Sequence, residues 1–140
     1  MTDKELIELL NRAIRMELRV CIQYMWQHIL WKEKKTRKAL EETAITEMKH
    51  AEKIAKRVVA LGGTPATEPI PVEVGETPEK MIAIDIENEK EAIAFYKEII
   101  ETAEKLGDCE TVNLFKEILS DEEKHLKFFQ KTLEQLRSND

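Results

Sequence analysis

The chain has 140 residues, 36% of them charged, with a net charge of −6 and only four glycines and four prolines. This length suits one domain over residues 1–140, with enough chain to bury a core. The acidic balance argues against a nucleic acid as a specific partner, and no apolar run is long enough to span a membrane. Because Cys21 and Cys109 form no CxxC motif, we expect reduced thiols in a cytoplasmic protein.

Four segments carry apolar residues at helical spacing, which predicts an all-α protein. In the first segment, the inward stripe comprises Leu6, Ile7, Leu10, Ala13, Ile14, Val20, Cys21, Tyr24, His28 and Trp31. Glu17 lies on this stripe and is its one acidic member. A carboxylate buried there needs an ion pair, hydrogen bonds or a metal ion to offset its loss of water.

The second predicted helix begins near residues 36–38 and runs to Leu61, where two glycines end it. Its apolar stripe includes Glu47 and His50. Residues three apart share one face of a helix, so this Glu-x-x-His pair aims a carboxylate and an imidazole at the same point.

The segment from Gly62 to Thr77 is rich in proline and glycine and shows no helical period. Loops this long are uncommon inside a compact domain. When extended, its roughly 16 residues reach about 50 Å, the length of a long helix. We therefore expect a crossover connection that makes the second and third helices parallel.

Thr77 and Pro78 are typical of the capping residue and the first residue of a helix, and they open the third predicted helix. Its stripe is rich in isoleucine, and Glu89 falls within it. Glu87 and Glu91 fall in rows of polar or small residues. Glu89 is therefore the predicted inward acid of this helix.

The fourth predicted helix follows a break at Gly107 and repeats the pattern of the second. Its apolar stripe includes Glu122 and His125, whereas Glu123 lines up with polar residues and is expected to face water. Two Glu-x-x-His helices, with one inward glutamate from each of two others, form the di-metal arrangement of four-helix bundles.

The candidate metal ligands are therefore Glu17, Glu47, His50, Glu89, Glu122 and His125. Two divalent cations would neutralise the four carboxylates, and mixed oxygen and imidazole ligation suits iron or manganese, with zinc also possible. Glu47 and Glu122 share helices with the histidines and are the expected bridges, which leaves Glu17 and Glu89 as terminal ligands. One alternative is that these six residues are exposed or salt-bridged. Another is a metal-free interaction bundle, which buried acids would make costly.

Residues 10–18 with Gln23-Tyr24, residues 47–52 and residues 118–125 resemble bacterioferritin-type ferritins of the ferritin-like superfamily. The resemblance covers essentially the whole chain and implies a ferritin-like four-helix bundle with a long crossover between helices two and three. It also implies a ferroxidase centre that oxidises Fe(II) with O2 or H2O2, for iron storage, detoxification and protection against oxidative stress. Tyr24 matches the tyrosine that bacterioferritins keep beside this centre, although its spacing fits a core tyrosine equally well.

Met48 matches the methionine that ligates haem b across a two-fold dimer interface in bacterioferritins. The helix around it carries a second apolar strip, which comprises Ala44, Ile45, Met48, Ala51, Ala55 and Val59. This strip predicts a homo-oligomer built from two-fold dimers, in which Met48 either binds haem or only packs. Because bacterioferritins continue past the fourth helix and this chain stops at Asp140, a 24-subunit shell, the 12-subunit shell of Dps-like proteins and a dimer all stay open.

A non-storing di-iron oxidoreductase, such as a rubrerythrin-like peroxide reductase, is the alternative function. That family usually adds a four-cysteine iron site, which two scattered cysteines cannot build. Assembly size discriminates between the two functions, because only a shell can store mineral.

Overall fold

The computed structural model describes residues 3–139. Within this range the chain forms no strand, and its helices are α1 (Asp3–Leu30), α2 (Lys34–Ala60), α3 (Pro78–Lys105) and α4 (Cys109–Ser138). The all-α prediction is confirmed.

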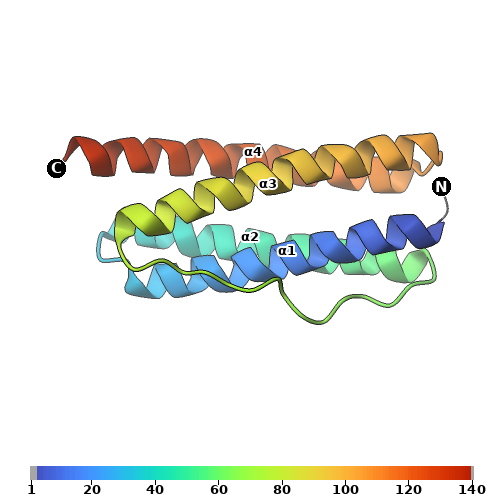
Figure 1. Cartoon of the computed structure of the whole chain (residues 1–140), viewed down its shortest axis with the longest axis horizontal. Coiled ribbons are helices and arrows are strands. Elements are labelled where there is room, and N and C mark those ends of the chain that lie inside the picture. The colour runs from blue at the N-terminus through green and yellow to red at the C-terminus, as the bar shows by residue number, and fades with distance from the viewer. Residues whose placement is uncertain (1–2, 140) are drawn as a thin grey trace.

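Figure 1 shows the four helices side by side, with the chain reversing direction between α1 and α2 and again between α3 and α4. The segment after α2 returns along the bundle, so that α3 runs parallel to α2 and α4 runs parallel to α1. The helix α1 packs mainly against α2, and α3 packs mainly against α4. This arrangement is the predicted four-helix bundle with a long crossover.

The start of α2 differs from the prediction. The helix begins at Lys34, before the predicted start at residues 36–38. The cause is Glu33, whose carboxylate accepts hydrogen bonds from the backbone N–H groups of Lys35 and Thr36. A side chain that satisfies the first free N–H groups of a helix fixes where the helix starts.

The crossover is fastened to α1 along its length. Asn11 bonds two backbone groups near the beginning of the crossover. Further on, the backbone N–H of Ile70 donates to the carbonyl of Arg15 at 3.2 Å. Near its end, the side chain of Gln27 donates to the carbonyl of Val74 at 2.8 Å. These bonds hold the long connection against one face of the bundle (Figure 1).

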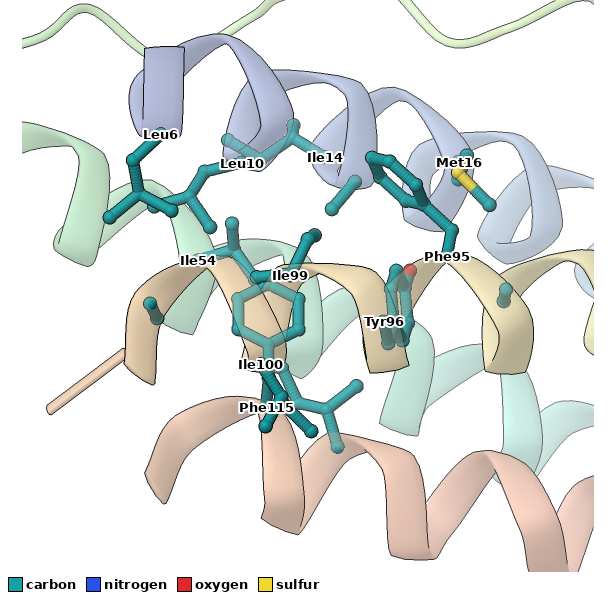
Figure 2. Close-up of a cluster of buried hydrophobic side chains, with 14 of the residues drawn as sticks. Leu6, Leu10, Ile14, Met16, Ile54, Phe95, Tyr96, Ile99, Ile100 and Phe115 are labelled. Atoms are coloured by element: carbon teal, nitrogen blue, oxygen red, sulfur yellow. The ribbon is translucent and has the colours of Figure 1, made fainter. Parts of the chain in front are cut away.

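The apolar core consists of two clusters with a charged layer between them. The larger cluster, shown in Figure 2, includes Leu6 and Leu10 of α1, Ile54 of α2, Ile99 of α3 and Phe115 of α4. The other cluster includes Val20, Tyr24, Leu40, Ile82 and Phe129. On every helix, the predicted inward acid falls between the residues of the two clusters. The fold therefore positions one charged layer near the middle of the bundle.

None of the four described helices has an apolar stretch long enough to cross a membrane. Both cysteines are free. The assignment of residues 1–140 to one domain stays a prediction, and Met1, Thr2 and Asp140 lie outside the described residues.

Candidate metal centre

The charged layer contains all of the predicted ligands. Exposure is 0% for Glu17 and Glu47, 1% for Glu89 and Glu122, and 2% for His50. His125 is more open, with 14% of its side chain exposed. A set of acids this deeply buried requires compensating positive charge or hydrogen bonds.

These residues form two overlapping groups. One group contains Glu17, Glu47, His50 and Glu122, and the other contains Glu47, Glu89, Glu122 and His125. Within each group, one candidate ligand atom from every residue lies within 4.8 Å of the others. Glu47 and Glu122 belong to both groups, which is the placement expected of bridging carboxylates.

Both imidazoles turn the same nitrogen towards the centre. Nδ1 of His50 lies 3.2 Å from Oε1 of Glu17 and 3.2 Å from Oε1 of Glu47. Nδ1 of His125 lies 3.0 Å from Oε1 of Glu122 and 3.5 Å from Oε1 of Glu47. Each Nδ1 is therefore aimed at the shared carboxylates.

Burial of several acids at one point makes their ionisation costly. Loss of water raises the pKa of Glu47 well above its ordinary value, and repulsion by Glu122 and Glu17 raises it further. Loss of water is also the main reason that the pKa values of Glu89 and Glu122 are raised. Cations bound among these carboxylates would offset this cost, because nearby positive charge favours the ionised form.

Several buried oxygens show where cations fit. Both carboxylate oxygens of Glu47, Oε2 of Glu17 and Oε2 of Glu89 are buried without a hydrogen-bond partner among the described residues. Buried polar atoms are rarely left in this state. Since carboxylate and imidazole donors suit iron, manganese or zinc, the residues present fit a pair of such ions. Their individual roles as ligands stay predictions.

Two buried tyrosines hold the outer glutamates across the bundle. The hydroxyl of Tyr24 on α1 donates to Oε1 of Glu89 on α3 at 2.6 Å. Conversely, the hydroxyl of Tyr96 on α3 donates to Oε1 of Glu17 on α1 at 3.1 Å. Tyr24 thus lies beside the centre. From the sequence, Tyr96 was assigned no role at the centre, although it follows Glu89 by the same seven residues that separate Tyr24 from Glu17.

Two other acids near the centre were also missed. Oδ2 of Asp121 lies 2.8 Å from Nε2 of His50, a contact between α4 and α2 that only the fold reveals. Asp85 is 0% exposed and accepts hydrogen bonds from Gln23 and Gln27, each at 2.9 Å. Burial raises the pKa of Asp85 to about 8, although both hydrogen bonds act to lower it. Asp85 precedes Glu89 by four residues, and this helical spacing was the signal that could have placed Asp85 on the inward face.

Met48 lies outside the centre, on the outer surface of α2, where it is 53% exposed. Ile45 and Val59, from the same predicted strip, are 38% and 59% exposed. Ala44 and Ala51 are buried instead, so the exposed strip is narrower than predicted.

Glu87, which the sequence placed away from the centre, has 75% of its side chain exposed. His28 belongs to neither ligand group, and its ring nitrogens lie 2.8 Å from the carbonyl oxygen of Arg37 and 3.0 Å from Oε2 of Glu41.

Comparison with known proteins places this centre in a known family. A family model described as a ferritin-like domain matches residues 7–139. The chain belongs to the ferritin family. Among ferritins, it is 35% identical over 133 residues to a bacterioferritin of Rhodobacter capsulatus. The aligned region covers 91% of this chain and 82% of that protein. It is 34% identical to a bacterioferritin of Brucella melitensis, over 96% of this chain and 86% of that protein.

Solved ferritin structures agree. The bacterioferritin of Desulfovibrio desulfuricans, which has a diiron site, superposes with a TM-score of 0.93 and is 30% identical in sequence. The match covers 97% of this chain and 82% of that chain. The Rhodobacter capsulatus bacterioferritin, solved with a metal-free dinuclear site, superposes with a TM-score of 0.90 and is 31% identical in sequence. The match covers 99% of this chain and 89% of that chain. The predicted resemblance to bacterioferritin-type ferritins is confirmed.

Proposed function

We propose that this protein is a ferritin-type ferroxidase, which oxidises Fe(II) at the buried centre for iron storage, detoxification and protection against oxidative stress. The observation that carries the proposal is the pair of carboxylate–histidine groups that share Glu47 and Glu122. The diiron site of the Desulfovibrio desulfuricans relative supports iron as the metal. Manganese and zinc remain chemically compatible with the same donors.

In this proposal, Glu47 and Glu122 would be ligands shared by the two ions. Glu17 and His50 complete one half of the centre, and Glu89 and His125 complete the other. Bound Fe(II) supplies the electrons that reduce the oxidant, which we propose to be O2 or H2O2.

The surrounding residues orient the ligands and limit access of water. Tyr96 and Tyr24 each occupy Oε1 of an outer glutamate and leave its Oε2 without a hydrogen bond. The two apolar clusters lie on either side of the charged layer and separate it from the ends of the bundle. The carboxylates are thereby held in a preformed arrangement, which reduces the reorganisation that metal binding requires.

The proposed assembly is a homo-oligomeric shell built from two-fold dimers in the cytoplasm, with 12 or 24 subunits. Ile45, Met48 and Val59 support it, because exposed apolar residues on one helix face are typical of a surface that packs in an assembly. In a two-fold contact through this face, both copies of Met48 approach the axis, as a haem b held by two methionines requires. The Rhodobacter capsulatus relative has its haem iron in a crystallographic special position.

The ferroxidase assignment is tested by rapid mixing of the purified protein with Fe(II) and O2. We expect Glu47→Ala and Glu122→Ala each to abolish the fast phase, since each removes a bridge, while circular dichroism still shows the helices. Glu87→Ala is the matched control, because its side chain is 75% exposed, and it should oxidise iron as the wild type does. Full activity in both bridge variants would refute the assignment.

The assembly is tested by the mass of the protein in solution, before and after iron loading. A shell that retains ferric mineral supports storage, whereas a dimer that retains none favours the non-storing peroxide reductase. Met48→Asp should break the assembly, and Met48→Leu should leave it intact while abolishing any low-spin haem spectrum. If the wild type takes up no haem, Met48 is a packing residue only.

A further inference from the structure

Asp121 is a fifth acid in contact with the centre, and none of the proposed roles uses it. It lies on α4 directly before Glu122 and reaches across to α2, where Oδ2 is 2.8 Å from Nε2 of His50. The imidazole is buried, with 3% of its side chain exposed, whereas 36% of the Asp121 side chain is exposed. Asp121 therefore contacts His50 from the side opposite the metal-facing carboxylates.

The two ring nitrogens of His50 have different surroundings. Nδ1 faces Glu17 and Glu47, each at 3.2 Å, and is the nitrogen placed to bind a metal. A histidine must be neutral to bind a metal, so its single ring proton must then be on Nε2. A carboxylate that accepts this proton fixes both the tautomer and the orientation of the ring. Asp121 is placed to do this.

His125 lacks the equivalent contact. Its contacts with the acids of the centre involve Nδ1, and no described residue accepts a hydrogen bond from Nε2. In the internal repeat, Thr46 precedes Glu47 as Asp121 precedes Glu122. The hydroxyl of Thr46 donates to the carbonyl of Glu42 on its own helix at 3.1 Å. The second histidine is therefore oriented by the centre alone.

We propose that Asp121 is a positioning residue that holds His50 ready to bind metal through Nδ1. As a result, the half of the centre that contains His50 binds its ion first and more tightly than the half that contains His125. This inference rests on the proposed metal centre, but it adds a residue and an order of loading that the ligand set alone does not give.

Co(II), added to the metal-free protein without O2, is a suitable probe because it accepts the same oxygen and nitrogen donors. Calorimetric titration should show two Co(II) sites of unequal affinity per wild-type chain. We expect Asp121→Ala to weaken the tighter site by about 10- to 100-fold, the usual effect of losing a partner of a metal-bound histidine, with little change at the weaker site.

Two further variants distinguish a positioning role of Asp121 from a general effect of its charge or of altered folding. Asp121→Asn keeps an acceptor oxygen and the shape of the side chain, so it should recover part of the lost affinity. Glu117→Gln removes the same charge one turn earlier on α4, where Glu117 pairs with Lys53 at the surface, and it should leave both sites unchanged. In crystals of the Zn(II)-loaded Asp121→Ala variant, the His50 ring should lose its single orientation.

The inference is overturned if Asp121→Ala retains both wild-type Co(II) affinities. It is also overturned if Glu117→Gln weakens the tighter Co(II) site as much as Asp121→Asn does, because loss of any nearby charge would then have the same effect. If Asp121→Ala does not fold, the Co(II) affinities of Asp121→Asn test the inference instead. Wild-type affinity of Asp121→Asn at both sites would show that the carboxylate of Asp121 does not position His50. A wild type that binds fewer than two Co(II) ions contradicts the metal centre itself, so the two failures are distinguishable.

Discussion

In the first half of the chain, His50 is held at both ring nitrogens, whereas in the second half His125 is held at one. The two halves otherwise match closely, since each supplies an outer glutamate, a shared glutamate, a histidine and a tyrosine. The difference lies outside the ligand set, where Asp121 contacts one ring and Thr46 bonds its own helix instead. Similar ligand sets can therefore belong to unequal sites.

The acid–base properties of the two histidines differ in the same way. Burial acts to lower the pKa of His50, but hydrogen bonds from its ring to Glu17 and Asp121 and attraction to Glu17 and Glu122 outweigh it and raise the value to about 9. Burial lowers the pKa of His125, and attraction to Glu89 does not fully compensate. The difference arises from both the ligands and their surroundings, because Glu17 and Glu122 act on His50 together with Asp121.

Loss of either histidine should have the largest effect. We expect His50→Ala and His125→Ala each to reduce Co(II) binding from two ions to one per chain. The remaining ion should bind more tightly in His125→Ala, because the half held by Asp121 survives there. Calorimetric titration measures both quantities. Two ions bound with wild-type affinity in either variant would exclude that histidine as a ligand.

Loss of the tyrosine hydroxyls should have a smaller effect, on the stability of the metal-free protein. The net contribution of a hydrogen bond is about 0.5–1.5 kcal/mol, and its loss leaves a buried acceptor unsatisfied. Tyr24→Phe should destabilise more than Tyr96→Phe, because Tyr24 makes the shorter bond and Glu17 keeps His50 as a partner at 3.2 Å. Scanning calorimetry of both variants tests this order, and the reverse order would show that the two halves are not held as described.

The smallest expected effect concerns the N-terminal caps of the two Glu-x-x-His helices. Partial burial opposes ionisation of Asp108, but hydrogen bonds from Thr111 and Arg57 outweigh it and lower the pKa of its carboxyl. Such a group stabilises the fold above its unfolded-state pKa, and this contribution is lost as the pH falls through the folded-state pKa.

At neutral pH, Asp108→Asn keeps a capping oxygen but removes the charge that pairs with Arg57 and faces the start of α4, so it should cost up to about 1 kcal/mol. The difference in melting temperature between Asp108→Asn and the wild type should become smaller towards pH 3 and below. Glu33→Gln, at the fully exposed cap of α2, is the control and should shift the melting temperature less. A difference that stays constant with pH would show that the charge of Asp108 does not contribute.

Much of this architecture could be predicted from the sequence, because helical spacing determines which residues share a face. Glu89 and Glu87 were separated in this way, and the structure gives them 1% exposure and 75% side-chain exposure, respectively. The long crossover followed from a segment with no period, and the crossover in turn set the relative directions of the helices.

The contacts between helices could not be predicted in the same way. Asp121 is only partly buried and lies at the margin of an apolar stripe, so its spacing did not indicate a partner on α2. Tyr96 lies on the apolar stripe of α3, but a spacing pattern does not show which acid its hydroxyl will meet. These contacts depend on the relative depth and rotation of packed helices.

The proposed metal centre requires the four acids and two histidines to bind two metal ions through shared glutamates. The most direct test is anomalous diffraction at the iron edge from crystals loaded with Fe(II) without O2. We expect two iron peaks per chain within the buried layer, with Glu47 and Glu122 in contact with both. Iron found only at surface acids, with the six buried residues unchanged and bound to no ion, would contradict it.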